Sequence, residues 1–281
     1  MSLSIAYLGP PGTNTETAAM AYVEHLKQIT GQECMLCPDP TIAASLQTVA
    51  LGEAMLGVVP VENSLEGSVS VTLDTLWQLD DLQIQKALVL PISHALISWA
   101  SSLSAIKTVY SHPQALAQCQ GWLEKTLPLS QLIPTPSTTE AVLRSSEDYE
   151  TAAIASARAA ELYQAPILAH PINDRPENCT RFWVVGKQPS PGGSHTSLAF
   201  SVPANVPGAL VKPLQTLANR GINMSRIESR PTKRSLGDYL FFIDLEADAR
   251  DPRTREALAE LETYTETMKI FGSYSIVCNE V

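Results

Sequence analysis

The C-terminal part of the chain carries the pattern that most restricts its fold. Beyond residue 196, strand and helix patterns follow one another in the order β-α-β-β-α-β, which is typical of the ferredoxin-like arrangement. The predicted strands span residues 197–202, 222–230, 239–245 and 269–274, and the predicted helices span 208–219 and 252–265. A stretch rich in Gly, Pro and Ser at 188–195 is typical of a linker. We therefore predict one domain at 196–281 and another at 1–187.

Residues 1–187 alternate between apolar strand patterns and helical patterns, which predicts an α/β sheet. The predicted strands span 5–8, 55–61, 82–90, 95–99, 106–110, 152–155 and 182–185. The predicted helices span 15–28, 69–79, 111–125 and 156–164, and one more begins with Asp39 as N-cap and Pro40 as its first residue. In open sheets of this kind, ligands collect where the carboxyl ends of strands meet helix N-termini.

Polar residues stand at several places where a ligand would collect. The turns at 9–13, 62–64 and 111–114 each lead from a strand toward a helix, and Thr180 and Arg181 stand at the mouth of the strand 182–185. Together they offer backbone N–H groups, hydroxyls and a guanidinium. The sequence therefore predicts a cleft that suits a carboxylate ligand in an otherwise acidic protein.

The overall charge limits the partners of this chain. Its 281 residues carry a net charge of −10 and a pI of about 5.0, so nucleic acids and anionic membranes would repel it and we expect neither as a partner. The N-terminus lacks the pattern of a signal peptide, and we expect a cytoplasmic location. Cys34 and Cys37 form a C-x-x-C motif within a predicted strand, where residues three apart face opposite sides, so we expect no metal site.

Several common catalytic motifs are missing from the sequence. It contains neither Gly-x-Ser-x-Gly nor His-Glu-x-x-His, which disfavours hydrolase and zinc-enzyme interpretations. The turn at 9–13 lacks both the Gly-Lys-Ser/Thr of a phosphate-binding loop and the G-x-G-x-x-G of a dinucleotide fold. His112 is the only histidine in the predicted site.

Four segments of the first domain resemble, in order, the signatures of monofunctional bacterial prephenate dehydratases: residues 9–13, 62–64 with 66–67, 111–115 through 118–119, and Asn178 with 180–182. The C-terminal domain resembles the regulatory ACT domain through residues 208–211 and 228–231. The sequence departs from the family at Asn14, where an aromatic residue is frequent, and at Met224, where leucine is frequent. The resemblance implies a catalytic domain of two α/β lobes, similar to type 2 periplasmic binding proteins, with the active site between them.

The resemblance also implies the reaction, in which prephenate loses carbon dioxide and its ring hydroxyl to give phenylpyruvate. Hydroxide is a poor leaving group, so the departing oxygen must receive a proton as the carboxylate is lost. The family assigns this role to Thr180, which we interpret as a hydrogen-bond donor or relay, with Glu62 or His112 as hypothetical support. The residues expected to hold the substrate are Thr13, Asn63, Ser64, Ser111, Gln118, Asn178, Arg181 and Phe182. No metal or organic cofactor is expected, because nothing is oxidised.

For the ACT domain, the resemblance implies phenylalanine as an allosteric effector. The expected effector-binding residues are Gly208, Ala209, Leu210, Val211, Leu214, Asn223, Met224, Glu228, Ser229 and Arg230. ACT domains usually pair side by side, so the resemblance also implies a homodimer or homotetramer.

Two alternative functions stay open at this stage. Arogenate dehydratase differs in its substrate by an amino group in place of the keto oxygen. A non-catalytic carboxylate or amino-acid binding protein has the same two-lobed plan, and Thr180 would be dispensable in it.

Overall fold

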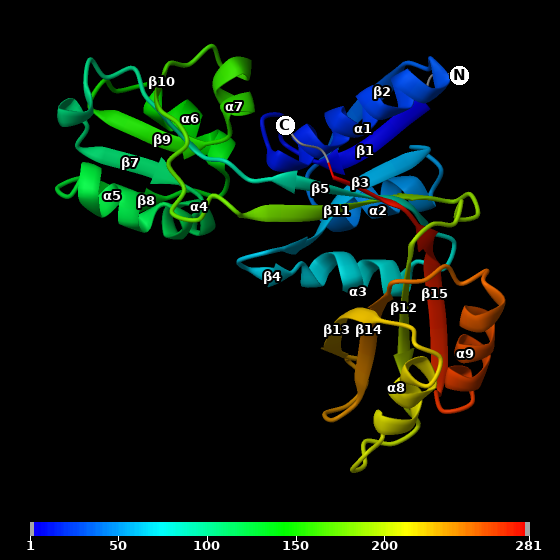
Figure 1. Cartoon of the computed structure of the whole chain (residues 1–281). Coiled ribbons are helices and arrows are strands. Elements are labelled where there is room, and N and C mark those ends of the chain that lie inside the picture. The colour runs from blue at the N-terminus through cyan, green and yellow to red at the C-terminus, as the bar shows by residue number, and fades with distance from the viewer. Residues whose placement is uncertain (1–2, 279–281) are drawn as a thin grey trace.

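The computed structural model describes residues 3–278, and among these the strands form three sheets (Figure 1). Two sheets belong to two lobes that face each other, and the third belongs to the C-terminal domain. The predicted α/β class is confirmed, as is the β-α-β-β-α-β order of the C-terminal domain. The ends of the predicted domain ranges, at 1–2 and 279–281, lie outside the described residues.

The first lobe is built on a mixed sheet with strand order β16-β5-β11-β3-β1-β2. Its strands are β1 (Leu3–Leu8), β2 (Cys34–Asp39), β3 (Leu56–Asn63), the short β4 (Gly67–Ser68) beside β3, β5 (Gln83–Pro91), β11 (Cys179–Gly186) and β16 (Ile276–Cys278). Its helices are α1 (Asn14–Thr30), α2 (Ile42–Ala50) and α3 (Ser70–Gln78). Apolar side chains of the sheet alternate between its faces, so α1 covers one face while α2 and α3 cover the other.

The second lobe has a sheet with strand order β10-β6-β9-β7-β8. Its strands are β6 (Ala95–Ile97), β7 (Thr108–Ser111), β8 (Gln131–Pro134), β9 (Thr151–Ala155) and β10 (Ile167–Ala169). Its helices are the short 3-10 helix η1 (Leu103–Ala105), α4 (Pro113–Gln118), α5 (Gln120–Thr126), α6 (Thr138–Ser145) and α7 (Ala157–Leu162). The chain enters this lobe after β5 and leaves it before β11, so the long antiparallel pair β5–β11 connects the lobes.

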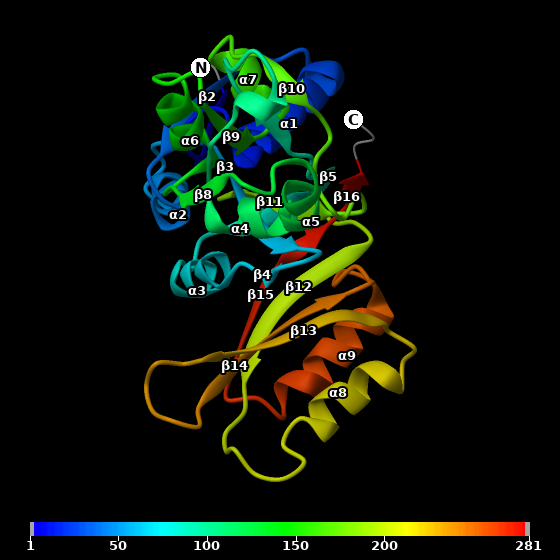
Figure 2. The ribbon, with the colours of Figure 1, turned by 90° about the vertical axis from the view of Figure 1, so that its left-hand side faces the viewer.

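The C-terminal domain packs its sheet between its own helices and the first lobe (Figure 2). The sheet order is β13-β14-β12-β15, with β12 (His195–Ser201), β13 (Met224–Pro231), β14 (Tyr239–Leu245) and β15 (Thr267–Tyr274). One face packs on α8 (Val211–Ala218) and α9 (Pro252–Glu262). The other face shares a buried core with the first lobe, in which Phe242, Phe271 and Tyr274 lie among Leu73, Trp183 and their neighbours.

Several element boundaries differ from the sequence prediction. Asp39 is not an N-cap, because it continues β2, where it pairs with Leu8, and Thr41 caps α2 by accepting a hydrogen bond from the Ala44 N–H. The helix predicted at 111–125 is broken at Cys119 into α4 and α5. The helix predicted from residue 208 begins at Val211.

Candidate active site

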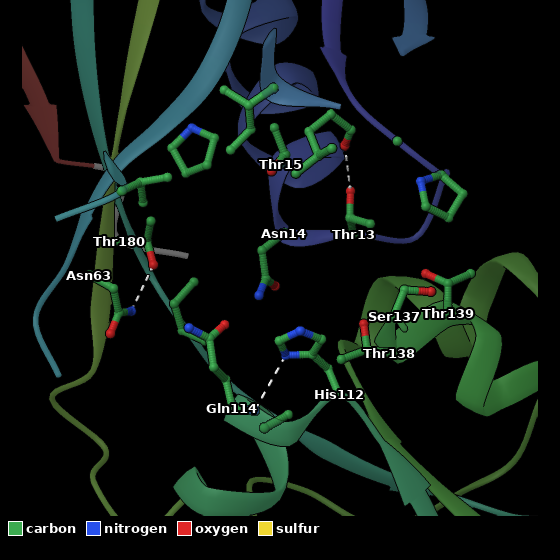
Figure 3. A pocket seen from close by; sticks show the side chains of 18 of the residues that line it. Thr13, Asn14, Thr15, Asn63, His112, Gln114, Ser137, Thr138, Thr139 and Thr180 are labelled. Carbon is green, nitrogen blue, oxygen red and sulfur yellow. Dashed lines mark hydrogen bonds between the residues drawn. The ribbon is translucent and has the colours of Figure 1, made fainter. Parts of the chain in front are cut away.

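A cavity of about 930 Å³ opens between the two lobes, within the size range of small-molecule sites (Figure 3). Residues from the ends of α1, α2, α3, α4 and α6 line it, together with residues of β3 and β11. Apart from Gln118 and Leu143, the helix residues that line the cavity come from N-caps and first turns, so the N-terminal ends of these helices lie at the cavity. The helix macrodipoles therefore give the cavity a positive potential.

The helix ends differ in how their first N–H groups are satisfied. Thr13 caps α1 by accepting from the Glu16 N–H at 3.2 Å, and Ser137 caps α6 by accepting from the Glu140 N–H at 3.0 Å. At α3, by contrast, Val69 stands in the N-cap position and supplies no side-chain hydrogen bond. The start of α3 is thus the helix end best suited to receive a carboxylate.

Thr180 lies on β11 with its side chain toward the cavity (Figure 3). The Asn63 amide Nδ2, on the neighbouring strand β3, donates a hydrogen bond to the Thr180 Oγ1 at 2.9 Å. Thr180 pairs with Asn63 across the two strands, which brings the two side chains together. Because Oγ1 already accepts from an amide, the hydroxyl proton is free to donate to a bound molecule.

A chain of amides connects Thr180 to His94 at the back of the cavity. Asn63 Nδ2 also donates to Asn178 Oδ1 at 2.9 Å, and Asn178 Nδ2 donates to Gln118 Oε1 at 3.0 Å. The same Gln118 oxygen lies 2.9 Å from His94 Nε2, while Gln118 Nε2 donates to the Glu66 carboxylate at 3.2 Å. Gln118 Oε1 is therefore an acceptor, and His94 carries its proton on Nε2.

His94 is almost fully buried, with 4% of its surface exposed. Burial lowers its pKa, and the hydrogen bond to Gln118 opposes that shift only in part. Its Nδ1 has no hydrogen-bond partner within residues 3–278. His94 is thus a neutral imidazole at neutral pH, and it fixes the orientation of Gln118.

Charged side chains contribute little positive potential to the cavity. Among the described residues that line it there is neither a lysine nor an arginine, whereas Glu66 and Glu140 are present. Anionic ligands would consequently depend on hydroxyls, amides and helix N-termini.

The two lobes also touch each other directly at one end of the cleft. Ser156 Oγ donates to the Gly12 carbonyl at 2.8 Å, and Arg158 Nε lies 3.4 Å from the Glu16 carboxylate. Gly12 has a φ of +90°, and a Cβ at this position would lie 3.3 Å from Ala159. Glycine is therefore required both by the backbone conformation and by the close approach of the second lobe.

The structure gathers part of the predicted substrate site around this cavity. Thr13, Asn63, His112, Gln118, Thr180 and Phe182 line it. Three other predicted residues are not part of the lining. Ser111 is buried and donates to the Ile154 carbonyl, while the exposed Ser64 donates to the buried Asn178.

Two predicted site residues, Glu62 and Arg181, lie elsewhere. Thr180 and Arg181 are consecutive in β11, so their side chains point to opposite faces of the sheet. The same alternation separates Glu62 from Asn63 on β3. Arg181 donates through Nη2 to the Glu62 carboxylate at 2.5 Å and to the Asp244 carboxylate at 2.9 Å, on the face toward the C-terminal domain. The expectation that these two residues surround the cleft is therefore wrong.

Further residues that were not among the predicted site residues line the cavity. His94 and the α6 start at 137–139 were not expected there, whereas Glu66, Asn14 and Gln114 stand in or beside segments that the sequence had marked. The sequence from Ser137 to Glu140 has the spacing of a capping box, which is typical of a helix start, and this signal could have placed 137–139 beside the other strand-to-helix turns.

The predicted effector residues lie in two segments of the C-terminal domain. Residues 208–210 form the turn that leads into α8, while Met224, Glu228, Ser229 and Arg230 lie on β13 at the edge of the sheet. Leu210 and Met224 pack partly against the core beneath α8 and α9. Arg230 reaches the first lobe, where its guanidinium donates to both oxygens of Asp74 on α3 at 3.1 and 3.0 Å.

Comparisons with known proteins identify the family. The model described as prephenate dehydratase matches residues 5–190, and the ACT domain model matches residues 196–263. The chain belongs to the prephenate dehydratase family. Among its relatives, the bifunctional chorismate mutase/prephenate dehydratase of Aquifex aeolicus is 42% identical over 97% of this chain and 73% of its own length. A prephenate dehydratase of Mycobacterium sp. (strain JLS) is 38% identical over 96% of this chain and 88% of its own length.

Solved structures share the whole architecture. The prephenate dehydratase of Arthrobacter aurescens in complex with L-Phe superposes with a TM-score of 0.85 at 34% identity, covering 97% of this chain and 90% of that one. A structure described as GqqA, a novel type of quorum quenching acylase, superposes with a TM-score of 0.82 at 31% identity, covering 98% of both chains. Because a second activity is described for the same fold, the assignment of a reaction to this chain depends on its site.

No three His, Cys, Asp or Glu side chains lie close enough together to hold a metal ion within residues 3–278. None of the helices in that range has the length and apolar character needed to cross a membrane.

Proposed function

We propose that this chain converts prephenate to phenylpyruvate in the cavity between the lobes, with Thr180 as the residue that acts on the departing hydroxyl. The observation that carries this proposal is the Asn63–Thr180 hydrogen bond at 2.9 Å, which occupies Thr180 Oγ1 as an acceptor and leaves its proton available to a ligand in the cavity. As the ring carboxylate leaves as carbon dioxide, its bonding electrons enter the ring, and the ring hydroxyl leaves as water after accepting a proton. The Asn63 amide stabilises negative charge that develops on the Thr180 oxygen.

The proton that replaces the one donated by Thr180 must come from another group or from solvent, because a threonine hydroxyl is a weak acid. Glu62 is too remote for this role, since its carboxylate is engaged by Arg181 on the other face. Glu66 and His112 both line the cavity, and His112 holds the start of α4 through its Nδ1, which accepts from the Gln114 N–H at 3.3 Å. We assign the support of Thr180 to this pair.

Helix N-termini take the place of cationic side chains in holding the substrate. The two carboxylates of prephenate would lie at the ends of α1, α3 and α6, where N–H groups and hydroxyls converge. The absence of lysine and arginine among the described lining residues makes this the principal source of positive potential. The dianion would therefore be bound by fixed dipoles that need no reorganisation during the reaction.

The decisive experiment incubates the purified protein with prephenate and follows phenylpyruvate formation. Turnover that is lost in Thr180→Ala supports the proposal, whereas turnover that is unchanged in this variant contradicts it. Arogenate in a competition assay tests the close enzymatic alternative, and an N-acylated amide substrate tests the acylase activity described for GqqA. Binding of prephenate without turnover would indicate the non-catalytic alternative.

Feedback regulation by phenylalanine is the second part of the proposal. The Arthrobacter aurescens structure contains L-Phe, and this chain carries an ACT domain of its own. We assign the effector to the α8 entry and the β13 edge, where residues 208–211 and Asn223 stand at the surface or half-buried. β13 has a free edge in the described sheet, which a second copy of the chain would cover in a homodimer or homotetramer. A cytoplasmic location accords with this biosynthetic role.

A further inference from the structure

Strand β11 carries the reacting side chain on one face and a charged anchor on the other. Thr180 and Phe182 line the cavity, whereas Arg181 and Trp183 face the C-terminal domain. At this point the pairing between β11 and β3 is irregular, with a register shift between Arg181 and Phe182. An irregularity of this kind re-aims side chains locally and is frequent next to active sites, while the pairing of β11 with β5 on its other side stays regular at these residues.

The anchor belongs to a group of charges that we call the interface ion cluster, made of Glu62, Arg181, Arg226 and Asp244. Asp244, on β14, lies at its centre and has no exposed side-chain surface. Its Oδ2 accepts from Arg181 Nη2 at 2.9 Å and from Arg226 Nε at 2.8 Å, and its Oδ1 accepts from Ser197 Oγ at 2.6 Å. The charges of the cluster balance, with two carboxylates against two guanidinium groups.

Burial makes this cluster rigid and sensitive to the loss of any member. The side chains of Arg181 and Arg226 are 13% and 8% exposed. Burial by itself would raise the pKa of Asp244, but the charges of Arg226 and Arg181 overturn that effect and hold the pKa below its usual value. A buried carboxylate that is ionised in this way needs both partners, so their positions are fixed relative to one another.

The cluster reaches the cavity by a second route. Arg226 Nη1 donates to Ser68 Oγ at 3.3 Å, and Ser68 lies in the cavity wall directly before α3. The Arg226 guanidinium also lies 5.6 Å from the Trp183 ring on β11. Arg226 itself stands on β13, between Met224 and Glu228, which are both expected effector residues. One carboxylate thus connects the edge strand of the ACT sheet to both the Thr180 strand and the α3 end of the cavity.

We propose that Asp244 is a positioning residue for the dehydration. By holding Arg181 and Arg226, it sets the geometry of Thr180 and Ser68. Through the same contacts it conveys the conformation of β13 to the cavity. This inference rests on the proposed function. A shift of β13 or β14 on effector binding would move the carboxylate, and the strand that carries Thr180 would follow. Small displacements of a positioned group are sufficient to change turnover strongly.

The test uses the full chain in three variants. Arg181→Met removes the tether and leaves Asp244 paired with Arg226 and Ser197, so it disturbs the cluster less than the loss of Asp244 would, and thermal unfolding checks that it is folded. The double variant Asp244→Asn with Arg226→Met removes the centre of the cluster while the charges stay balanced through Glu62 and Arg181. Asp80→Asn is the control, because Asp80 pairs with Lys269 across the same interface but is 92% exposed.

The principal readout is the ratio of kcat/KM for prephenate with saturating phenylalanine to kcat/KM without it, and calorimetry measures phenylalanine binding separately. Couplings between sites typically amount to factors of about 5 to 150. We expect Arg181→Met and the double variant to keep an affinity for phenylalanine within about threefold of wild type. Their kcat should fall about two- to tenfold with little change in KM. Their kcat/KM ratio with and without phenylalanine should lie within about twofold of one. Asp80→Asn should match wild type.

A ratio in Arg181→Met that stays closer to the wild-type value than to one would overturn the inference, whatever the double variant does. A wild-type protein that turns over prephenate but does not respond to phenylalanine would overturn it as well. If wild-type protein does not turn over prephenate at all, the proposed function itself fails. A merely structural role would lower the thermal stability of the variants and leave the ratio unchanged.

Discussion

The two faces of the first-lobe sheet differ in the charge of the side chains that they present. The face toward the cavity presents uncharged groups, with Thr180 held by Asn63 and no lysine or arginine among the described lining residues. The face toward the C-terminal domain presents Arg181 and Glu62, which meet Arg226 and the fully buried Asp244. Consecutive residues of one strand serve both faces.

The difference shows on which face of the sheet charged side chains are tolerated. A cavity that must admit a dianion and release a monoanion gains from fixed dipoles, since a buried cation would hold substrate and product alike. A permanent interface has no such restriction, because its charges are compensated by one another and by hydrogen bonds. On this part of the sheet, arginine therefore stands on the face toward the C-terminal domain, where no ligand has to be released.

The largest predicted effect contrasts neighbouring residues of β11. We expect Thr180→Ala to lower kcat by at least about 10²-fold, the usual contribution of a positioned proton donor, and Thr180→Ser to retain about a tenth of the activity. Arg181→Met, one residue away on the opposite face, should lose less than about tenfold. Steady-state kinetics with prephenate decides the matter, and full turnover in both Thr180 variants would break the comparison.

The second prediction concerns the group that holds Thr180. Asn63→Ala removes the donor to both Thr180 and Asn178, and we expect kcat to fall by about 10- to 100-fold. Asn219→Ala serves as a matched control, because Asn219 is an exposed residue at the end of α8 that accepts only from Gln215 among the bonds described. Equal activity in both variants would show that Thr180 needs no partner on β3.

The third prediction tests the interface face through its stability. Asp74 on α3 accepts from Arg230 and Lys233 of the C-terminal domain, and Asp74→Asn should lower the free energy of unfolding by about 1–2 kcal/mol. Burial alone would raise the pKa of Asp74, but these two cations hold it below its usual value. The contribution is therefore present above the unfolded pKa of about 3.9 and is lost as the pH falls through the folded value. Denaturant titrations at pH 7 and at about pH 3, below the unfolded pKa, should show that the variant differs less from wild type in acid.

The smallest predicted effect is the pH dependence of stability that His94, in the cavity lining, contributes. The pKa of His94 is lowered by burial, so the unfolded chain binds a proton there at pH values where the folded protein does not. Stability is complete above the unfolded pKa of about 6.5 and declines as the pH falls below it. Between pH 7.5 and 5.5 wild type should lose more stability than His94→Gln, as measured by chemical denaturation. Parallel curves would indicate that the pKa of His94 is the same in the folded and unfolded states.

The sequence predicted the places where ligand groups gather better than the direction of individual side chains. The turns after β1, β3 and β7 were identified from strand-to-helix transitions, and Thr13, Asn63, His112 and Gln118 do line the cavity. Arg181 was grouped with Thr180 by adjacency, although alternation along a strand separates consecutive side chains. The partner that draws Arg181 away, Asp244, is 63 residues distant in the chain, and no local pattern indicates it.

Local competition between signals explains the boundaries that were missed. Asp39 and Pro40 form a plausible helix start, but Asp39 completes the ladder with β1, and Thr41 provides a cap two residues later. The helix after His112 breaks at Cys119 because Asp174, from a distant loop, accepts from the N–H groups of Gly121 and Trp122 and so provides a new helix start. Such long-range partners are invisible to periodicity.

The short strand β16 gives the regulatory domain two covalent connections to the same sheet. The chain leaves the first lobe after β11 and, after β15, re-enters it as β16, which lies parallel to β5. In that sheet β5 lies between β11 and β16, so the exit strand and the return strand flank the same strand. A domain joined to the sheet by one chain connection could rotate freely about it. A domain joined at both ends can only shear or tilt. Any signal it sends must therefore take the form of a small strain in the β5–β11 ribbon, the same ribbon that joins the two lobes.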